Sequence, residues 1–84
     1  MGYYYIKCRS VTYAQCVSDF LRAKGINSGV VKLPLKYSEE GCGYSVKISE
    51  RQFKKANKLI GEAQFEITKV YYSVNNIEFK EVVL

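Results

Sequence analysis

The sequence predicts a small α+β domain in which two helices pack on one face of an antiparallel β-sheet. Short runs of alternating aromatic and β-branched residues, typical of strands, are interspersed with two longer segments whose apolar residues recur at helical spacing. The segments follow the order strand, helix, strand, strand, helix, strand, with one more strand at the C-terminal end. A chain of 84 residues is short even for one domain, so we expect a single domain over residues 1–84.

The first strand and the first helix form the N-terminal part of this pattern. Residues 3–8 place aromatic or apolar side chains on alternating faces of a strand. Ser10 and Thr12 are both candidate N-caps for the helix that follows, and Thr12 with Gln15 forms a T-x-x-Q capping-box pattern. Apolar residues then recur at helical spacing until Gly25, which stands where a left-handed helix C-cap is expected.

The middle of the chain predicts two strands joined by a loop. Residues 26–33 form a β-branched strand that ends at Pro34, because proline lacks the N–H that a sheet needs. The sequence PLKYSEEG, residues 34–41, is typical of a loop. A third strand, residues 42–48, follows this loop.

The C-terminal half predicts a helix and a hairpin. Ser49–Gln52 is a second capping-box pattern, and apolar residues at helical spacing extend it as a helix to about Ala63. A strand that contains residues 70–72 comes next. Asn75–Asn76 tolerates positive φ, so we expect these two residues to form the turn of a hairpin that leads into a fifth strand.

Chain topology converts this order of elements into a fold. Right-handed crossovers fold the order β-α-β-β-α-β into a ferredoxin-like sandwich, here with an extra C-terminal β-strand. With the strands numbered along the chain, we therefore predict the sheet order 5-4-1-3-2. Residues 74–84 form a hairpin extension of the core domain.

The composition excludes several kinds of active site. The chain has no histidine, which removes Ser-His-Asp, Cys-His and histidine-metal sites together. The three cysteines are Cys8, Cys16 and Cys42, and their odd number and spacing make a poor disulfide framework and a poor zinc pattern. We therefore expect reduced thiols, no metal and no cofactor.

Charge and hydropathy limit the partners. A net charge of +5 favours anionic partners weakly, but the basic residues lack the clustering typical of a nucleic-acid binder. No apolar run approaches the roughly 18 to 20 residues of a membrane-spanning helix. We expect a cytoplasmic protein that binds neither a membrane nor a nucleic acid.

Cys42 is the strongest candidate for a chemical role. The predicted topology brings the loop before Cys42 to the same end of the sheet as the start of the first helix. The amides and dipole at the N-terminus of that helix, Ser10 to Thr12, favour a nearby anion such as a thiolate, and Arg9 adds a positive charge. Such surroundings lower the pKa of a thiol by about one unit or more from about 8.5, which increases the fraction of nucleophilic thiolate.

The two glycines that flank Cys42 allow two interpretations. Gly41 and Gly43 permit unusual backbone angles and let a partner's thiol approach the Cys42 sulfur closely. Alternatively, they only shape the change from loop to strand, and Cys42 is a small buried hydrophobe, as many cysteines are. The residues themselves leave both interpretations open.

The other two cysteines have simpler interpretations. Cys8 shares strand parity with Ile6, and a register that pairs residue 8 with residue 42 would make Cys8 a resolving thiol able to attack a persulfide on Cys42. The alternative is that Cys8 belongs to the core. Cys16 stands beside the apolar stripe of the first helix, and we interpret it as a packing residue.

Two stretches of the sequence resemble a known family. YYYIKCRSVTYA, residues 3–14, and PLKYSEEGCGYSVKI, residues 34–48, are similar to the putative selenium/sulfur carrier protein-like family, in which an aromatic strand opens the domain and Gly-Cys-Gly follows a proline-containing loop. The resemblance covers about residues 3–72. It implies a cysteine that carries sulfur or selenium as a persulfide or selenosulfide, here Cys42, with a donor protein and an acceptor protein as partners.

The tyrosines suggest a different class of function. Tyr3 and Tyr5, joined by Tyr71 or Tyr72, are expected on the open face of the sheet, where they would stack bases or contact a partner subunit. No RNA-recognition pattern appears on the third strand, so we favour a protein partner, such as a second copy in a homodimer. Two classes therefore remain: a thiol-based carrier, and a non-enzymatic binding or regulatory module that uses this face. We favour a carrier or binding protein over a stand-alone enzyme.

Overall fold

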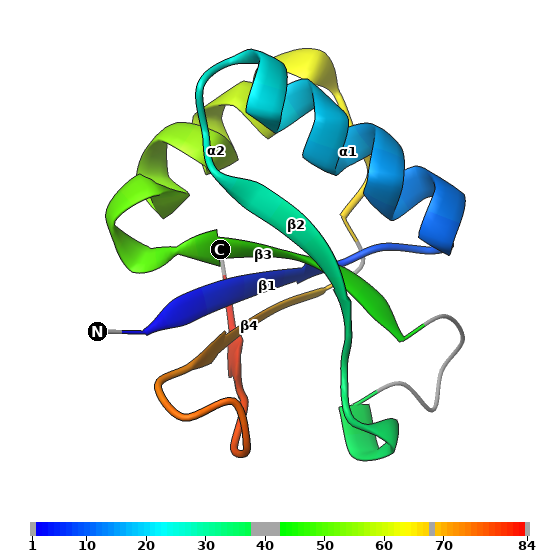
Figure 1. Ribbon diagram of the computed structural model, residues 1–84, viewed down its shortest axis with the longest axis vertical. Helices are drawn as coiled ribbons and strands as arrows, with labels where there is room; N and C mark the ends of the chain where they lie inside the picture. The colour runs from blue at the N-terminus through cyan, green and yellow to red at the C-terminus, as the bar shows by residue number, and fades with distance from the viewer. Residues whose placement is uncertain (1, 38–42, 68, 84) are drawn as a thin grey trace.

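The computed structural model describes residues 2–37, 43–67 and 69–83 and shows two helices packed on a five-stranded antiparallel sheet (Figure 1). Its elements are β1 (Tyr3–Lys7), α1 (Val11–Ala23), β2 (Ser28–Lys32), the short 3-10 helix η1 (Leu35–Tyr37), β3 (Tyr44–Ser49), α2 (Glu50–Ala63), β4 (Lys69–Ser73) and β5 (Lys80–Val82). This mixed α+β architecture is the one that the sequence predicts.

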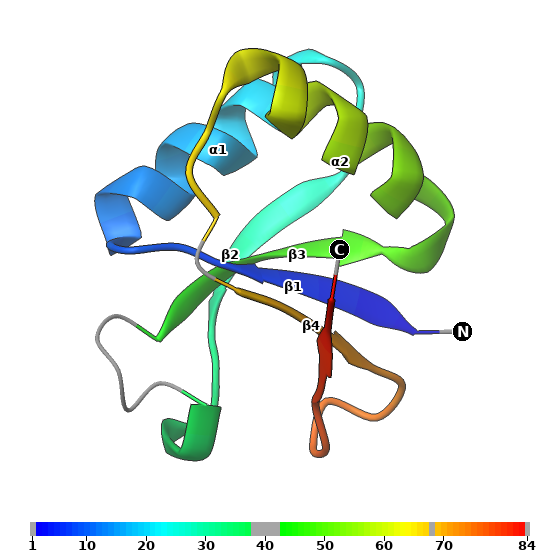
Figure 2. The ribbon, with the colours of Figure 1, turned by 180° about the vertical axis from the view of Figure 1, so that it is seen from behind.

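The sheet has the strand order β2-β3-β1-β4-β5, and every neighbouring pair of strands is antiparallel. This order is 5-4-1-3-2 when it is read from the other edge. Both helices cover one face of the sheet, while η1 and the hairpin between β4 and β5 lie on the opposite side (Figures 1 and 2). The two faces of the sheet are therefore packed against different segments of the chain.

The main core lies between the sheet and the helices. Ile6 of β1 is 1% exposed and stands between Val46 of β3 and Val70 of β4 in the strand register. Leu21 of α1 and Ile60 of α2 belong to the same buried cluster. Strand β1 is therefore paired with a neighbouring strand at each edge and packed against the helix side of the core. These contacts also hold the chain that leads from β1 into α1.

Helix α1 begins at a different cap from the one that the capping-box pattern favoured. The hydroxyl of Ser10, not that of Thr12, accepts a hydrogen bond from the Tyr13 amide at 3.1 Å. The helix ends as predicted, because Gly25 has a φ of +84°, a conformation that glycine adopts without steric cost.

Helix α2 also begins without the predicted capping box. Ser49 is the N-cap residue but makes no side-chain capping bond, and the Gln52 side chain instead accepts from the Asn27 amide at 3.2 Å. The Glu50 carboxylate accepts from the Gly2 amide, just before β1, at 3.1 Å and from the Tyr72 hydroxyl of β4 at 2.6 Å. The start of α2 is thus held by contacts that are distant in sequence.

The hairpin before β5 has a longer turn than predicted. Residues 74–79 separate β4 from β5, so the two-residue Asn75–Asn76 turn is wrong. The Asn75 side-chain oxygen accepts from the amides of Ile77 at 2.9 Å and Glu78 at 3.0 Å, and Asn76 has a φ of 61°. Both asparagines therefore shape the turn, although not as its only residues.

The Glu50 contacts predict an acid-dependent loss of stability. The Tyr72 hydroxyl and then the Gly2 amide hold the pKa of Glu50 below the ordinary value of 4.5 by bonding its ionised form. A group with a lowered folded-state pKa contributes stability above its unfolded pKa and loses it as the pH falls through the folded value. In acid titrations of the thermal midpoint, Glu50→Gln should therefore lose less stability below about pH 4.5 than the wild type. Identical acid slopes for the two proteins would contradict this role.

Candidate functional site

The predicted site residues that the structure describes lie at one end of the sheet, where β1 leads into α1 and β3 begins. Cys42 and Gly41 lie outside the described residues, but Gly43 is described and is buried. The Gly43 carbonyl accepts from the Leu33 amide at 2.7 Å, and the Tyr44 carbonyl accepts from the Cys8 amide at 3.2 Å. Gly43 is therefore bonded to the residue that follows β2, and Tyr44 is bonded to the residue that follows β1.

The N-terminus of α1 lies at this same end. Ser10 satisfies one amide of the first turn, and Val11 and Thr12 are exposed. The first turn of a helix carries the positive end of the dipole, so it stabilises an anion that comes near it. Ser10 acts as a cap, and Thr12 lies on the solvent side of the first turn.

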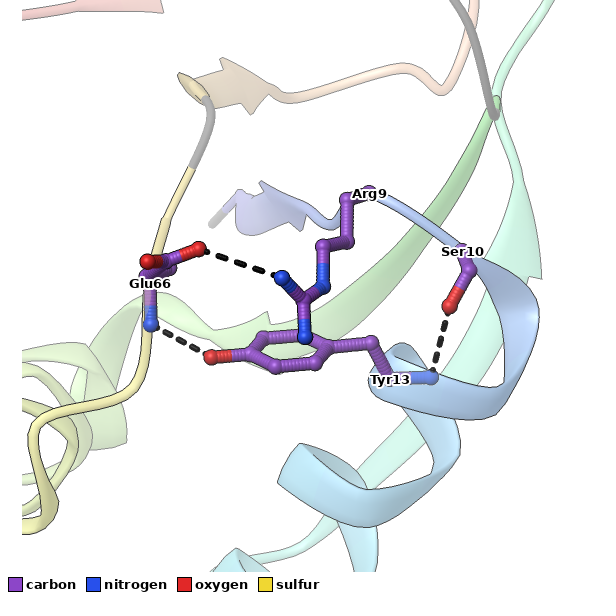
Figure 3. A network of polar contacts seen from close by, with 4 residues as sticks. All are labelled: Arg9, Ser10, Tyr13 and Glu66. Carbon is purple, nitrogen blue, oxygen red and sulfur yellow. Dashed lines mark hydrogen bonds and ion pairs between the residues drawn. The ribbon is translucent and has the colours of Figure 1, made fainter.

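Arg9 is engaged by neighbours that the sequence did not reveal. Its guanidinium lies 4.6 Å from the centre of the Tyr13 ring and forms an ion pair with Glu66 at 3.4 Å, as Figure 3 shows. The Tyr13 hydroxyl also accepts from the Glu66 amide at 2.5 Å. Both side chains of the ion pair are exposed, so the pair adds little stability. The expected full charge of Arg9 at the site is thus partly offset by Glu66, 57 residues away in the chain.

Cys8 is a residue of the core. It is 0% exposed, lies in the cluster between sheet and helices, and its sulfur donates to the Ile6 carbonyl at 3.5 Å. The register of β1 with β3 pairs Lys7 with Ser45, and the next backbone bond sets Cys8 against Tyr44. The register that would favour a resolving role, residue 8 opposite residue 42, is therefore not the one in the structure, and the alternative of a core residue describes the position of Cys8. A resolving role for Cys8 stays a prediction.

Cys16 is exposed on α1, so its interpretation as a packing residue is wrong. The apolar stripe of the helix instead consists of residues such as Val17 and Leu21, both 0% exposed. Cys16 lies one position beside this stripe. A shift of one residue along the helix turns the side chain toward solvent, because consecutive residues on a helix point about 100° apart.

The three thiols should differ in their rates of alkylation at neutral pH. We expect Cys42 to react first, Cys16 more slowly as an exposed reference thiol, and Cys8 last because the core covers it. Timed alkylation with iodoacetamide, followed by peptide mass spectrometry, measures the order. Modification of Cys8 or Cys16 before Cys42 would contradict an activated thiol at residue 42.

The second face of the sheet is not the open tyrosine surface that the sequence suggested. Tyr5 is 3% exposed and Tyr71 is 6% exposed, and both are covered by Tyr37 of η1 and Phe79 of the hairpin. Tyr3 remains 40% exposed. Tyr72 lies on the helix side, where its ring is 4.9 Å from that of Tyr4. The aromatic patch expected for stacking bases or a partner subunit is therefore largely internal.

Lys7 is a cation that the sequence reading did not consider for the site. It is 3% exposed and stands across the strands from Ser45 and from Lys69. The sequence could have indicated this position, because Lys7 shares strand parity with Tyr3 and Tyr5 and therefore lies on the same, covered face of β1. Lys7 places a positive charge near the end of the sheet where β3 begins.

Two further searches concern the described part of the chain alone. Residues 2–37, 43–67 and 69–83 contain no group of three histidine, cysteine, aspartate or glutamate side chains that could hold a metal ion. Neither described helix has the length and the apolar character that crossing a membrane requires.

Comparison with known proteins identifies the family. The chain belongs to the family described as "Putative Se/S carrier protein-like", which matches residues 3–72. No curated protein matches the chain, and no solved structure does. The matched region contains all three cysteines and the start of α1, and it ends before the hairpin that leads into β5.

Proposed function

We propose that this protein carries sulfur or selenium on Cys42 as a persulfide or selenosulfide. The observation that carries the proposal is membership in the carrier-like family, because the match spans residues 3–72 and so includes Cys42 and the residues around it. The proposal includes a donor protein that loads Cys42, an acceptor protein that unloads it, and a reducing cytoplasmic setting. It also treats the chain as a single domain with the ferredoxin-like βαββαβ arrangement plus β5.

The carrier reaction is an exchange of sulfur between thiols. In loading, the Cys42 thiolate attacks the outer sulfur of a donor persulfide, the donor S–S bond breaks, and the donor leaves as a thiolate. Cys42 then holds the outer sulfur and its proton. In unloading, an acceptor thiolate attacks the same outer sulfur and Cys42 leaves as the thiolate. The sulfur changes partners without net oxidation or reduction, and an outer selenium atom exchanges in the same way.

The described residues that follow Cys42 in the chain support this proposal. Gly43 follows Cys42 directly and is bonded to the residue after β2, and Cys8 and Ser10 connect the adjoining end of β1 to the first turn of α1. A helix N-terminus favours a thiolate, which is the species that attacks and the species that leaves. Glycine at residues 41 and 43 keeps side-chain bulk away from an incoming donor sulfur.

The other two thiols fit a carrier role less well. A donor cannot reach Cys8 while the core covers it, since its side chain is 0% exposed. Cys16 is accessible but lies within α1, five residues after its first residue, where the helix has no unpaired amides to favour a thiolate. Cys42 is the remaining thiol.

Loading with a small donor tests the function directly. The full chain is incubated with glutathione persulfide, separated from the donor, and weighed by intact mass spectrometry. We expect one added sulfur that disappears when dithiothreitol is supplied as an acceptor. A chain that gains no sulfur, or that keeps it in the presence of dithiothreitol, would contradict the proposal.

A further inference from the structure

Part of the sheet face opposite the helices is left uncovered by η1 and the C-terminal hairpin, and it is hollowed. A hollow of about 650 Å³ lies where β1 begins and β3 leads into α2, and it is lined by Gly2, Tyr3, Asn27, Ser49, Arg51 and Gln52. A second hollow of about 300 Å³ shares three of these residues and adds others, among them Gly29 and Lys47. Small-molecule sites commonly have volumes of about 300–1,000 Å³, so the two adjoining hollows, which we call the Tyr3 groove, have the size of a ligand site.

The walls of the Tyr3 groove are held together by contacts between distant segments. The Asn27 amide, just before β2, donates to the Gln52 side-chain oxygen of α2 at 3.2 Å. The Glu50 amide of α2 donates to the Gly2 carbonyl, just before β1, at 3.1 Å. The starts of β1, β2 and α2 are therefore fixed relative to one another, so the groove is formed before a ligand enters.

The floor of the Tyr3 groove is bare at Gly29. Gly29 of β2 stands opposite Lys47 of β3 in the strand register, so both residues belong to the same face of the sheet. Apart from its own chain neighbours, a Cβ atom placed at Gly29 would meet no heavy atom within 4 Å. A ligand can therefore approach the backbone of β2 closely, and a larger side chain at residue 29 would occupy the groove instead.

Tyr3 and Lys47 place an aromatic ring and a cation side by side in the groove. Tyr3 is 40% exposed, and the Lys47 ammonium lies 4.2 Å from the centre of its ring. This is a cation–π contact, which holds the positive charge beside the ring. Exposed aromatic rings stack on nucleobases, since every base has a π-face. The groove therefore offers a stacking surface with positive charge next to it.

The charge of the groove is positive. Arg51 of α2 is exposed on its wall and adds a second cation to that of Lys47. Within residues 2–37, 43–67 and 69–83, neither cation is in an ion pair, and no groove-lining residue is acidic. The adjacent carboxylate of Glu50 binds the Gly2 amide and the Tyr72 hydroxyl. The groove is therefore complementary to an anion, although its two cations come from different elements and form no cluster in the sequence.

We propose that the Tyr3 groove binds a nucleotide, with the base stacked on the exposed part of the Tyr3 ring and the phosphate bound by Lys47 and Arg51. The guanidinium forms paired hydrogen bonds with phosphate oxygens, and the ammonium adds a compact charge. The Asn27 carboxamide and the Ser49 hydroxyl, which makes no capping bond, provide polar groups for the base edge or the ribose. This site goes beyond the sulfur-carrier proposal and does not depend on it.

Titration of the isotope-labelled full chain with AMP, followed by NMR through the amide chemical shifts, tests the site. We expect saturable shifts at the amides of Asn27, Gly29, Lys47 and Arg51, and none along α1. Adenosine and ribose 5-phosphate, the two halves of the ligand, are titrated in the same way. Because stacking and phosphate binding act together, each half should bind at least about tenfold more weakly than AMP.

Variants of the groove test its parts separately. Gly29→Val fills the groove without changing the charge, and it should abolish AMP binding. Tyr3→Leu removes the ring and Arg51→Gln removes a cation, so each should weaken AMP binding at least about fivefold. Tyr3→Phe keeps the ring and should bind as the wild type does. Thermal midpoints report the fold, and if Tyr3→Leu fails to fold, Gly29→Val and Arg51→Gln carry the test.

Arg22→Gln is the matched control for Arg51→Gln. Arg22 is also an exposed arginine on a helix, but it lies on α1, in the layer that covers the opposite face of the sheet. The two variants lose the same charge. Because distant exposed charges are screened by salt, Arg22→Gln should change the dissociation constant of AMP by less than about twofold.

A short single-stranded oligoadenylate distinguishes the two sources of a nucleotide. Tighter binding than that of AMP, with shifts at the same residues, would assign the groove to a nucleic-acid strand, and equal or weaker binding would assign it to a free nucleotide.

Three results would overturn the inference. They are an AMP titration without saturable shifts in the groove, ribose 5-phosphate that binds as tightly as AMP, and equal losses in Arg51→Gln and Arg22→Gln. No readout involves Cys42 or a sulfur donor, so a failure of sulfur loading would reject the carrier function without altering these results.

Discussion

Replacing Cys42 with serine should abolish sulfur loading, reducing the sulfur on the protein to the level seen without a donor. A serine hydroxyl is nearly isosteric with a thiol but cannot form the S–S bond that holds the transferred atom. We expect the variant to keep its fold, because serine is close in size to cysteine and the substitution leaves the described core residues such as Cys8 unchanged. Loading with glutathione persulfide and release to dithiothreitol measure the loss, and the thermal midpoint reports the fold.

Cys16→Ser is the matched control for this experiment. It makes the same chemical change at an exposed thiol outside the core, so it should load and release sulfur as the wild type does. Full loading of Cys42→Ser, or a comparable loss in Cys16→Ser, would move the carrier role to another residue. A folded Cys8→Ala variant that loads sulfur but no longer releases it would support the resolving role of Cys8.

The largest loss of stability should follow from Ile6→Ala. Ile6 is 1% exposed at the centre of the sheet, with Val46 and Val70 as its cross-strand neighbours, so truncation leaves a cavity that these strands cannot close. Such truncations lower the free energy of unfolding by about 2–5 kcal/mol. That is a large part of the roughly 5–15 kcal/mol that stabilises a small domain. Urea unfolding of the purified variants measures the change.

Ile77→Ala is the control for this substitution, because Ile77 carries the same side chain at 72% exposure. It should alter the free energy of unfolding by no more than about 0.5 kcal/mol. Similar losses for the two variants would mean that β1 is not the centre of the core. A small effect at both positions would have the same meaning.

The elements of this fold could be predicted because each one has a periodic sequence pattern. The apolar spacing of α1, with Val17 and Leu21 on one stripe, and the alternation of Tyr4 and Ile6 in β1 both reflect burial on one face. Gly25 marked the end of α1 because few other residues adopt its φ of +84°. These are local signals, and they place local structure well.

The contacts that the sequence did not predict are those between distant segments. Ser49 and Gln52 looked like a capping box, yet the start of α2 is held by the Glu50 carboxylate, which binds Gly2 and Tyr72 that only the assembled sheet brings near it. Tyr5 looked exposed because nothing in strand alternation indicates that Tyr37 and Phe79 fold over that face. Alternation states which side chains share a face and not what covers the face.

At the candidate site, too, local sequence patterns were informative and contacts between distant segments were not predicted. The sequence predicted that Arg9 and Ser10 lie at the same end of the sheet as the residues that begin the third strand, and the contacts of Gly43 and Tyr44 confirm this for the described residues. The role of Cys42 stays a prediction. The register of Cys8 with Tyr44 and the ion pair of Arg9 with Glu66 depend on tertiary packing. Strand parity without a fixed register could not decide which residue of β3 lies opposite Cys8.

Peptide-level mass spectrometry of the loaded wild-type chain tests the carrier assignment most directly. After exposure to glutathione persulfide, the remaining thiols are alkylated, the chain is digested, and the peptides that contain Cys8, Cys16 and Cys42 are compared. We predict that the added sulfur lies on the Cys42 peptide and that the same peptide loses it to an acceptor thiol. Added sulfur on the Cys8 or Cys16 peptide, with Cys42 unmodified, would contradict the account.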